Sequence, residues 1–138
     1  AVFLTTKTVL PWMIEAKKGS IVNIASVVGL KGVAYMSAYG AAKAGLINFS
    51  RAAAIEAAPY VRVNCLIPGA VLTPATERAI PDEAMMKATI NSIPLKRIAE
   101  PIELAKPISF LLSSDSSFIT GASLVVDGGK TADLNAGN

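Results

Sequence analysis

Two short runs of β-branched residues, separated by one long helix-forming segment, constrain the fold of this chain most. Residues 20–26 and 61–67 are apolar runs bounded by glycine or proline, which is typical of strands covered on both faces. Between them, residues 37–58 consist mainly of good helix formers, and Pro59 ends the helix. The order strand, helix, strand predicts a right-handed crossover between parallel strands and therefore an α/β fold.

Further segments extend this pattern on both sides. Residues 2–18 and 101–114 have the composition and spacing of amphipathic helices, and residues 122–126 are expected to form a third strand. Residues 70–100 show no sustained period. We expect a long loop there with one helical piece near 82–92, and loops of this length are usually functional lids.

Composition and charge exclude several classes of protein. The chain has 138 residues, enough for one domain, and its 52% of hydrophobic residues exclude intrinsic disorder. Charged residues or prolines interrupt every apolar run before the roughly 18 residues that a membrane-spanning helix needs. The net charge of +3 is scattered along the chain, which argues against a nucleic-acid surface. We expect a cytoplasmic protein with a small-molecule partner and without nucleic-acid or membrane partners.

The cysteine and histidine content excludes two kinds of site. The chain has no histidine, so a zinc site and a Ser-His-Asp triad are both unsupported, and we expect no metal. Its single cysteine, Cys65, lies in the apolar run 61–67 and cannot form an internal disulfide. We expect Cys65 to be a small buried hydrophobic residue without chemistry.

Three residues predict proton-transfer chemistry. Tyr39 and Lys43 are four residues apart in the expected helix, so they lie on one face, one turn apart. A phenol is ordinarily too weak an acid to exchange protons near neutral pH, but a neighbouring ammonium stabilises the phenolate. Ser26 ends the preceding strand, and its hydroxyl could bind the same substrate oxygen. Together they predict a general acid/base with an electrostatic clamp.

The context of these residues gives the pattern its weight. Alone, Tyr-x-x-x-Lys arises by chance in many helices, where an exposed lysine simply lies beside a half-buried tyrosine. Here Ser26 precedes Tyr39 by thirteen residues, and Asn64-Cys-Leu-Ile-Pro68-Gly69 follows. With its closing segments, the chain resembles the short-chain dehydrogenase/reductase family over nearly its whole length. The closing segments are Phe110-Leu-Leu-Ser-Ser-Asp115, Ile119-Thr-Gly121 and Val126-Asp-Gly-Gly129.

The resemblance implies a role for each residue that matches the family's motifs. Tyr39 would donate or accept the proton, Ser26 would orient the carbonyl or hydroxyl, and Lys43 would hold the nicotinamide ribose of NAD or NADP. The backbone at Val71 and the hydroxyl of Thr73 would bind the nicotinamide end of the cofactor. The cofactor itself carries the hydride.

Some residues of the same motifs can also be explained by a structural role. Pro68 and Gly69 belong to the expected cofactor-binding loop, but they are also ordinary residues for the turn that ends a strand. Asn64, Asp127 and the last glycines fit an architectural role better than a catalytic one.

The family's Gly-rich turn, which holds the pyrophosphate at a helix N-terminus, is not found in these 138 residues. We therefore expect residues 1–138 to be the C-terminal part of a single Rossmann-like domain, without its dinucleotide-binding half. Such a piece would leave Ile21, Val22 and Ile24 on the bare edge of a parallel sheet, which is an aggregation hazard.

Several functions remain open at this point. The first is NAD(P)-dependent interconversion of an alcohol and a ketone, and the second is reduction of a 3-oxoacyl thioester. A third is a catalytically silent fragment that acts only in association. The apolar residues of the expected lid suit an apolar substrate and packing on the sheet equally well. The resemblance also implies a homo-oligomer, a tetramer formed by pairing of the long helices.

Overall fold

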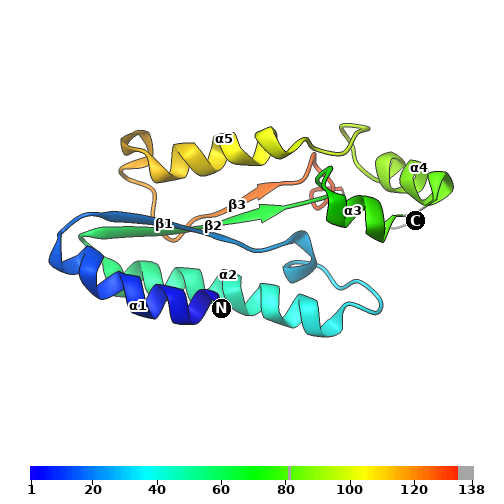
Figure 1. Cartoon of the computed structure of the whole chain (residues 1–138). Coiled ribbons are helices and arrows are strands. Elements are labelled where there is room, and N and C mark those ends of the chain that lie inside the picture. The colour runs from blue at the N-terminus through cyan, green and yellow to red at the C-terminus, as the bar shows by residue number, and fades with distance from the viewer. Residues whose placement is uncertain (81, 134–138) are drawn as a thin grey trace.

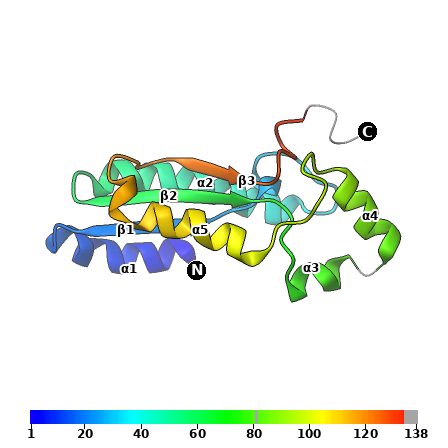
Figure 2. The same ribbon diagram turned by 90° about the horizontal axis from the view of Figure 1, so that it is seen from above.

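The computed structural model describes residues 1–80 and 82–133 and has three layers (Figure 1). Helices α1 (Val2–Glu15) and α2 (Ser37–Ala57) lie side by side on one face of a parallel sheet. Helix α5 (Pro101–Leu112) covers the other face, as Figure 2 shows from above. Two flanking layers around a parallel sheet are the architecture that the crossover pattern predicts, so the predicted α/β class is confirmed.

The sheet has three parallel strands in the order β1 (Gly19–Ile24), β2 (Val61–Pro68) and β3 (Ser123–Val126). Gly19 is paired with Val61 in the first ladder, and Cys65 with Ser123 in the second. Because all strands run in the same direction, their carboxyl ends meet at one edge of the sheet. The loops that leave these strands therefore lie near one another.

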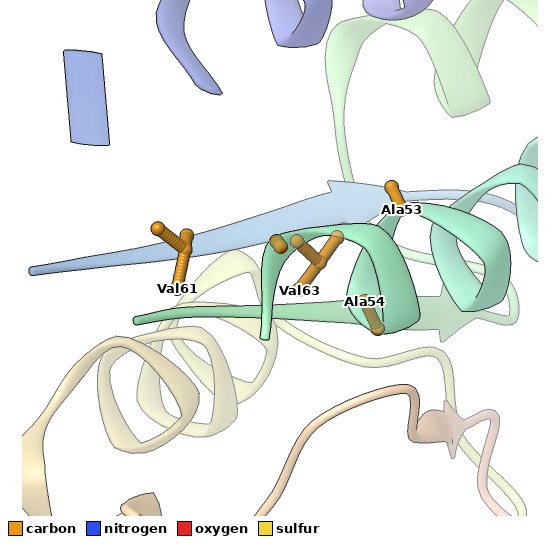
Figure 3. Packing of buried hydrophobic residues seen from close by; sticks show 5 residues of the cluster. Ala53, Ala54, Val61 and Val63 are labelled. Carbon is orange, nitrogen blue, oxygen red and sulfur yellow. The ribbon is translucent and has the colours of Figure 1, made fainter. Parts of the chain in front are cut away.

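The core forms where α2 packs on β2. Figure 3 shows Val61 and Val63 of β2 beside Ala53 and Ala54 of α2, and all four side chains are at most 3% exposed. The short alanine side chains let the helix axis approach the strand closely, so the valines pack directly against the helix. Partly buried residues of α1 complete this cluster: Leu10, Met13 and Ile14.

Cys65 belongs to a second buried cluster on β2. Its side chain is fully buried, together with Ala25, Ile47 and Ile67. Burial raises the pKa of the Cys65 thiol, which keeps it in its neutral form. The expectation of a small buried hydrophobic residue is confirmed.

Strand β1 is shorter and more exposed than the sequence predicts. It ends at Ile24 rather than at Ser26, and Asn23 alone among its six residues is buried. The reason is its position, because β1 has a described neighbour on one side only. The expectation that this strand forms an edge is correct for the described residues. Helices α1 and α5 contact it from the two faces of the sheet, as expected, but most of its side chains are only partly buried.

The segment 70–100 contains two helices where the sequence predicts one. Helix α4 (Glu83–Asn91) is the predicted piece, and α3 (Pro74–Ala79) was not predicted. Helix α3 forms because Thr73 caps its first turn by accepting a hydrogen bond from the amide of Thr76, and Pro74 fits the first helical position. Six residues are too few to establish a helical period in the sequence.

The far end of the sheet is held by one arginine. Arg62 of β2 donates hydrogen bonds to the carbonyl oxygens of Leu111, Ser113 and Ile119 and to the hydroxyl of Ser116. These acceptors extend from the end of α5 through the short helix η2 (Ser114–Ser116) to Ile119, in the segment that leads into β3. Arg62 therefore fixes the connection to β3.

Within the described part of the chain, no helix has both the length and the apolar character to cross a membrane. The same residues contain no group of three His, Cys, Asp or Glu side chains placed to hold a metal ion.

Candidate active site

Ser26 lies where the chain leaves β1. It has extended backbone angles and caps the short helix η1 (Val27–Gly29), and its hydroxyl accepts a hydrogen bond from the amide of Val28 at 3.3 Å. The side chain is half-buried. Since the hydroxyl accepts in this bond, its own proton remains available for another partner.

Helix η1 is pressed against the first turns of α2. A β-carbon built on Gly29 would lie 2.8 Å from the amide nitrogen of Ala44 and from the carbonyl carbon of Lys43. One built on Gly40 would lie 3.1 Å from the carbonyl oxygen of Val28. Only glycine permits the contact at position 29 without movement. This backbone contact places η1, the short helix that Ser26 caps, beside the turn of α2 that carries Lys43.

Lys43 joins the end of β1 to Tyr39. Its ammonium donates a hydrogen bond of 2.9 Å to the carbonyl oxygen of Ile24, and the same nitrogen lies 5.6 Å from the centre of the Tyr39 ring. A cation over an aromatic face at this distance is an attractive contact. The structure therefore brings Tyr39 and Lys43 together, and it places the Lys43 ammonium at Ile24, which precedes Ser26 by two residues in the chain.

Tyr39 is 44% exposed, so the described residues do not enclose it. A groove of about 460 Å³ opens beside Lys43 between the start of α1 and α2. Phe3, Leu46 and Phe49 make it apolar, and neither Ser26 nor Tyr39 is among its lining residues. The three predicted residues thus lie at the carboxyl end of β1. The described residues do not form a closed pocket around them.

The end of β2 supplies the second part of the site. Pro68 is the last residue of the strand and pairs with Val126, and the amide of Gly69 donates to the carbonyl oxygen of Val126 at 3.0 Å. A β-carbon on Gly69 would lie 2.8 Å from that of Asp127. Both residues therefore have a structural role in bringing the ends of β2 and β3 together.

Val71 and Thr73 follow in the same loop. Val71 forms a parallel bridge with Ala99, and its carbonyl oxygen accepts a hydrogen bond of 2.6 Å from the hydroxyl of Thr76. The bridge bonds use the neighbours of Val71, so its own amide points to the opposite side, where no described residue accepts from it. The hydroxyl groups of Thr73 and Thr76 form a hydrogen bond of 3.1 Å.

Asn64 and Asp127 have architectural roles, as the sequence suggests. Asn64 is fully buried, donates to the carbonyl of Ile119 and accepts from the amide of Ala122. Burial by itself would raise the pKa of Asp127, but hydrogen bonds from Thr131 and from the amide of Gly129 outweigh it and lower the pKa. Asp127 stays charged and folds the turn after β3.

Sequence reasoning missed two features of this edge. One is Thr76, whose spacing of three residues from Thr73 is the signal of a helix cap and could have been found. The other is an ion pair between Arg97 and Glu103, which the six-residue separation around Pro101 concealed.

Comparison with known proteins agrees with this geometry. A family model described as "Enoyl-(Acyl carrier protein) reductase" matches residues 1–131. Cyclopentanol dehydrogenase of Comamonas sp. (strain NCIMB 9872) is 40% identical over 133 residues, which cover 96% of this chain and 53% of that protein. The chain belongs to the short-chain dehydrogenase/reductase family.

Two further proteins match the chain with similar coverage. The 3-oxoacyl-[acyl-carrier-protein] reductase of Thermotoga maritima is 43% identical over 129 residues, which cover 93% of this chain and 52% of that protein. The structure of a gluconate 5-dehydrogenase from Burkholderia cenocepacia, in complex with NADP and tartrate, superimposes with a TM-score of 0.91 at 30% identity. It covers 96% of this chain and 52% of that one. The chain thus spans about half the length of these short-chain dehydrogenases/reductases, and its fold is their Rossmann fold.

Proposed function

We propose that these residues form the catalytic part of an NAD(P)-dependent oxidoreductase that interconverts an alcohol and a ketone. The observation that carries the proposal is the position of the Lys43 ammonium, held by the carbonyl of Ile24 and lying against the ring of Tyr39. A fixed cation beside a phenol, next to the serine that ends β1, provides proton transfer and charge stabilisation at one place.

Each of the three residues has one task in this proposal. Tyr39 gives its proton to the substrate oxygen during reduction and takes it back during oxidation. Ser26 donates a hydrogen bond to that oxygen, because its hydroxyl proton is not used by the bond from Val28. Lys43 stabilises the negative charge that develops on the phenol. The nicotinamide, when bound, supplies the hydride to the carbonyl carbon or accepts it from the alcohol.

The donors at the ends of β1 and β2 suit a nicotinamide nucleotide. The ammonium of Lys43 has three protons and uses one on Ile24, which leaves two for ribose hydroxyls. The amide of Val71 and the hydroxyl of Thr73 suit the carboxamide end, and Pro68 and Gly69 shape the loop that presents them. We further propose that the pyrophosphate-binding residues lie outside these 138 residues, since the chain spans about half of its relatives.

The lid favours an apolar substrate. Helices α3 and α4 have no buried residue among those described, and Met85 in α4 is 50% exposed. Met85 is therefore available to contact a substrate, whereas Ile80, Met86 and Ile90 are partly buried, so the exposed part of the lid supports the apolar-substrate interpretation without excluding packing on the sheet. A cyclic or aliphatic ketone and a 3-oxoacyl thioester are both compatible with this surface.

The test is a pair of tyrosine variants in the enzyme that contains this chain. Tyr39→Phe removes the proton donor and should lower kcat at least about 100-fold, the range attributed to general acid/base catalysis. Tyr60→Phe is the matched control, because Tyr60 lies against Lys17 at a similar 5.7 Å but directly before the start of β2, at the opposite end of the strand from the proposed site. Absorbance of the reduced cofactor, with cyclic ketones and a 3-oxoacyl thioester as substrates, measures both. Equal activity of the two variants would refute the catalytic assignment.

We also expect residues 1–138 alone to show no turnover, because the donors for the pyrophosphate are missing. The same assay on this chain, with NADH and with NADPH, tests that expectation. Cofactor-dependent turnover above the background rate would contradict it.

A homo-oligomer is part of the proposal. The helices α1 and α2 expose large apolar side chains, with Trp12 at 72% and Ile55 at 80%. A second copy packed on this layer would remove them from water. Light scattering of the wild type and of Ile55→Glu tests it, and a mass that does not change between them would count against this surface. The cytoplasmic location expected from the sequence stays a prediction.

A further inference from the structure

The ion pair between Arg97 and Glu103 encloses a short piece of chain that contacts the proposed cofactor loop. Both guanidinium nitrogens donate to the two carboxylate oxygens, at 2.5 and 2.6 Å. The same carboxylate accepts a hydrogen bond of 2.9 Å from the amide of Glu100. A two-pronged contact of this type fixes orientation as well as distance. The backbone from 97 to 103 is thereby closed into a loop.

Ala99 lies in the middle of that closed segment, and it is the residue that holds the cofactor loop. Its carbonyl oxygen accepts from the amide of Leu72 at 2.8 Å, and its amide donates to the carbonyl oxygen of Ala70 at 3.2 Å. These two bonds flank Val71 on both sides. The direction of the Val71 amide therefore depends on the position of Ala99.

We infer that Arg97 and Glu103 are positioning residues that hold Ala99, and through it the loop at Val71, in the conformation that binds the cofactor. The inference rests on the proposed function for the part that concerns the cofactor. The two side chains do not touch the reacting atoms. They reduce the conformational freedom of a loop that a ligand would otherwise have to order on binding.

A plain helix cap is the competing explanation for Glu103. It lies in the first turn of α5, and its bond to the amide of Glu100 satisfies a donor at the helix start. That bond does not need Arg97. Arg97→Gln therefore separates the two explanations, because it opens the closed segment and leaves the cap in place.

The experiment measures amide hydrogen exchange in the 138-residue chain. With Arg97→Gln we expect exchange at Leu72 and Ala99 to become about fivefold faster, the scale of an exposed but well-oriented ion pair. Exchange at Cys65, whose amide donates to Ala122 within the sheet, should not change. Arg78→Gln is the matched control, since Arg78 is an exposed arginine of the same lid.

The outcomes separate the explanations. Unchanged exchange at Leu72 and Ala99 in Arg97→Gln would overturn the inference and leave Glu103 as a cap only. If Arg78→Gln has the same effect as Arg97→Gln, the change reflects the loss of charge and the inference also fails. Because the pair is exposed, the difference should shrink in about 1 M salt.

A second measurement connects the loop to the cofactor. In the enzyme that contains this chain, Arg97→Gln should raise KM for the cofactor about threefold and leave kcat unchanged, the signature of lost ground-state binding. Faster exchange with an unchanged KM would support the positioning of the loop and refute the role that the proposed function gives to Val71.

Discussion

The contact between Gly29 and α2 permits a sharp test of how the site is positioned. Gly29 follows Ser26 by three residues, and its missing side chain faces the backbone of Lys43 and Ala44. Gly29 is not among the glycines with positive φ, so alanine is compatible with its backbone conformation. The effect of Gly29→Ala therefore comes from space alone.

The size of the effect follows from the distances. The new methyl group would lie 2.8 Å from two backbone atoms, whereas ordinary contacts begin near 3.4 Å, so η1 and α2 must separate by about 0.6 Å. Backbone atoms cannot turn away as a flexible side chain can. Overpacking of this kind costs about 1–3 kcal/mol. We expect about 2 kcal/mol, or roughly 8 °C in Tm for a chain of this length.

Gly45→Ala is the matched control for this variant. Gly45 lies in α2, the helix that Gly29 contacts, and a β-carbon there would meet nothing within 4 Å. Alanine is a better helix former than glycine, so this variant should be more stable by about 0.5–1 kcal/mol. The two substitutions are chemically identical and should have opposite signs.

The assay is urea unfolding followed by circular dichroism, with the midpoint compared at constant m-value. Separation of η1 from α2 should also lengthen the bond between Lys43 and Ile24, so Gly29→Ala should lower activity of the enzyme more than Gly45→Ala does. If Gly29→Ala is as stable as the wild type, backbone contact does not position this edge and the reasoning is refuted.

Three further predictions concern stability. Arg62→Met removes four hydrogen bonds from a charged donor and should lower the free energy of unfolding by about 3 kcal/mol, measured by urea unfolding. Ser50→Ala leaves the buried amide of Asn23 without its acceptor and should cost about 1–3 kcal/mol, whereas an unchanged midpoint would argue against that network. The guanidinium beside Glu103 lowers the pKa of its carboxyl from 4.5 to about 2, so its stabilising effect is complete above pH 4.5 and is lost as the pH falls towards 2. Glu103→Gln should therefore flatten the acid limb of Tm against pH, and an unaltered limb would contradict the assignment.

Local patterns were sufficient for the elements that carry the chemistry. The β-branched runs predicted β2 almost to its ends, and the composition of residues 37–58 predicted α2 within one residue. The spacing of Tyr39 and Lys43 predicted that they would meet, because four residues make one helical turn regardless of tertiary structure. These predictions depend on interactions within a few residues, which a sequence displays directly.

The remaining features depend on contacts between distant segments. The exposure of β1 follows from its neighbours in the sheet, and its own residues contain no signal for it. The acceptor for Lys43 is a backbone carbonyl nineteen residues earlier, which no side-chain pattern can reveal. The bridge from Val71 to Ala99 is likewise a pairing of two irregular segments.

Two close contacts at glycines hold the ends of β1 and β2, whereas the lid is held in a different way. Gly29 meets the backbone of α2, and Gly69 meets Asp127 after β3, so the chain after β1 is held by the helix layer and the chain after β2 by the end of its neighbouring strand. Such contacts leave no room for a side chain to adapt, and they hold Ser26 and Lys43 through the fold itself. The lid has no buried residue in α3 or α4, and it is tied to the strand ends through single bridges such as that of Ala99. Under the proposed function, changes of substrate would be accommodated in the lid, whereas changes at the strand ends would displace Ser26 and Lys43.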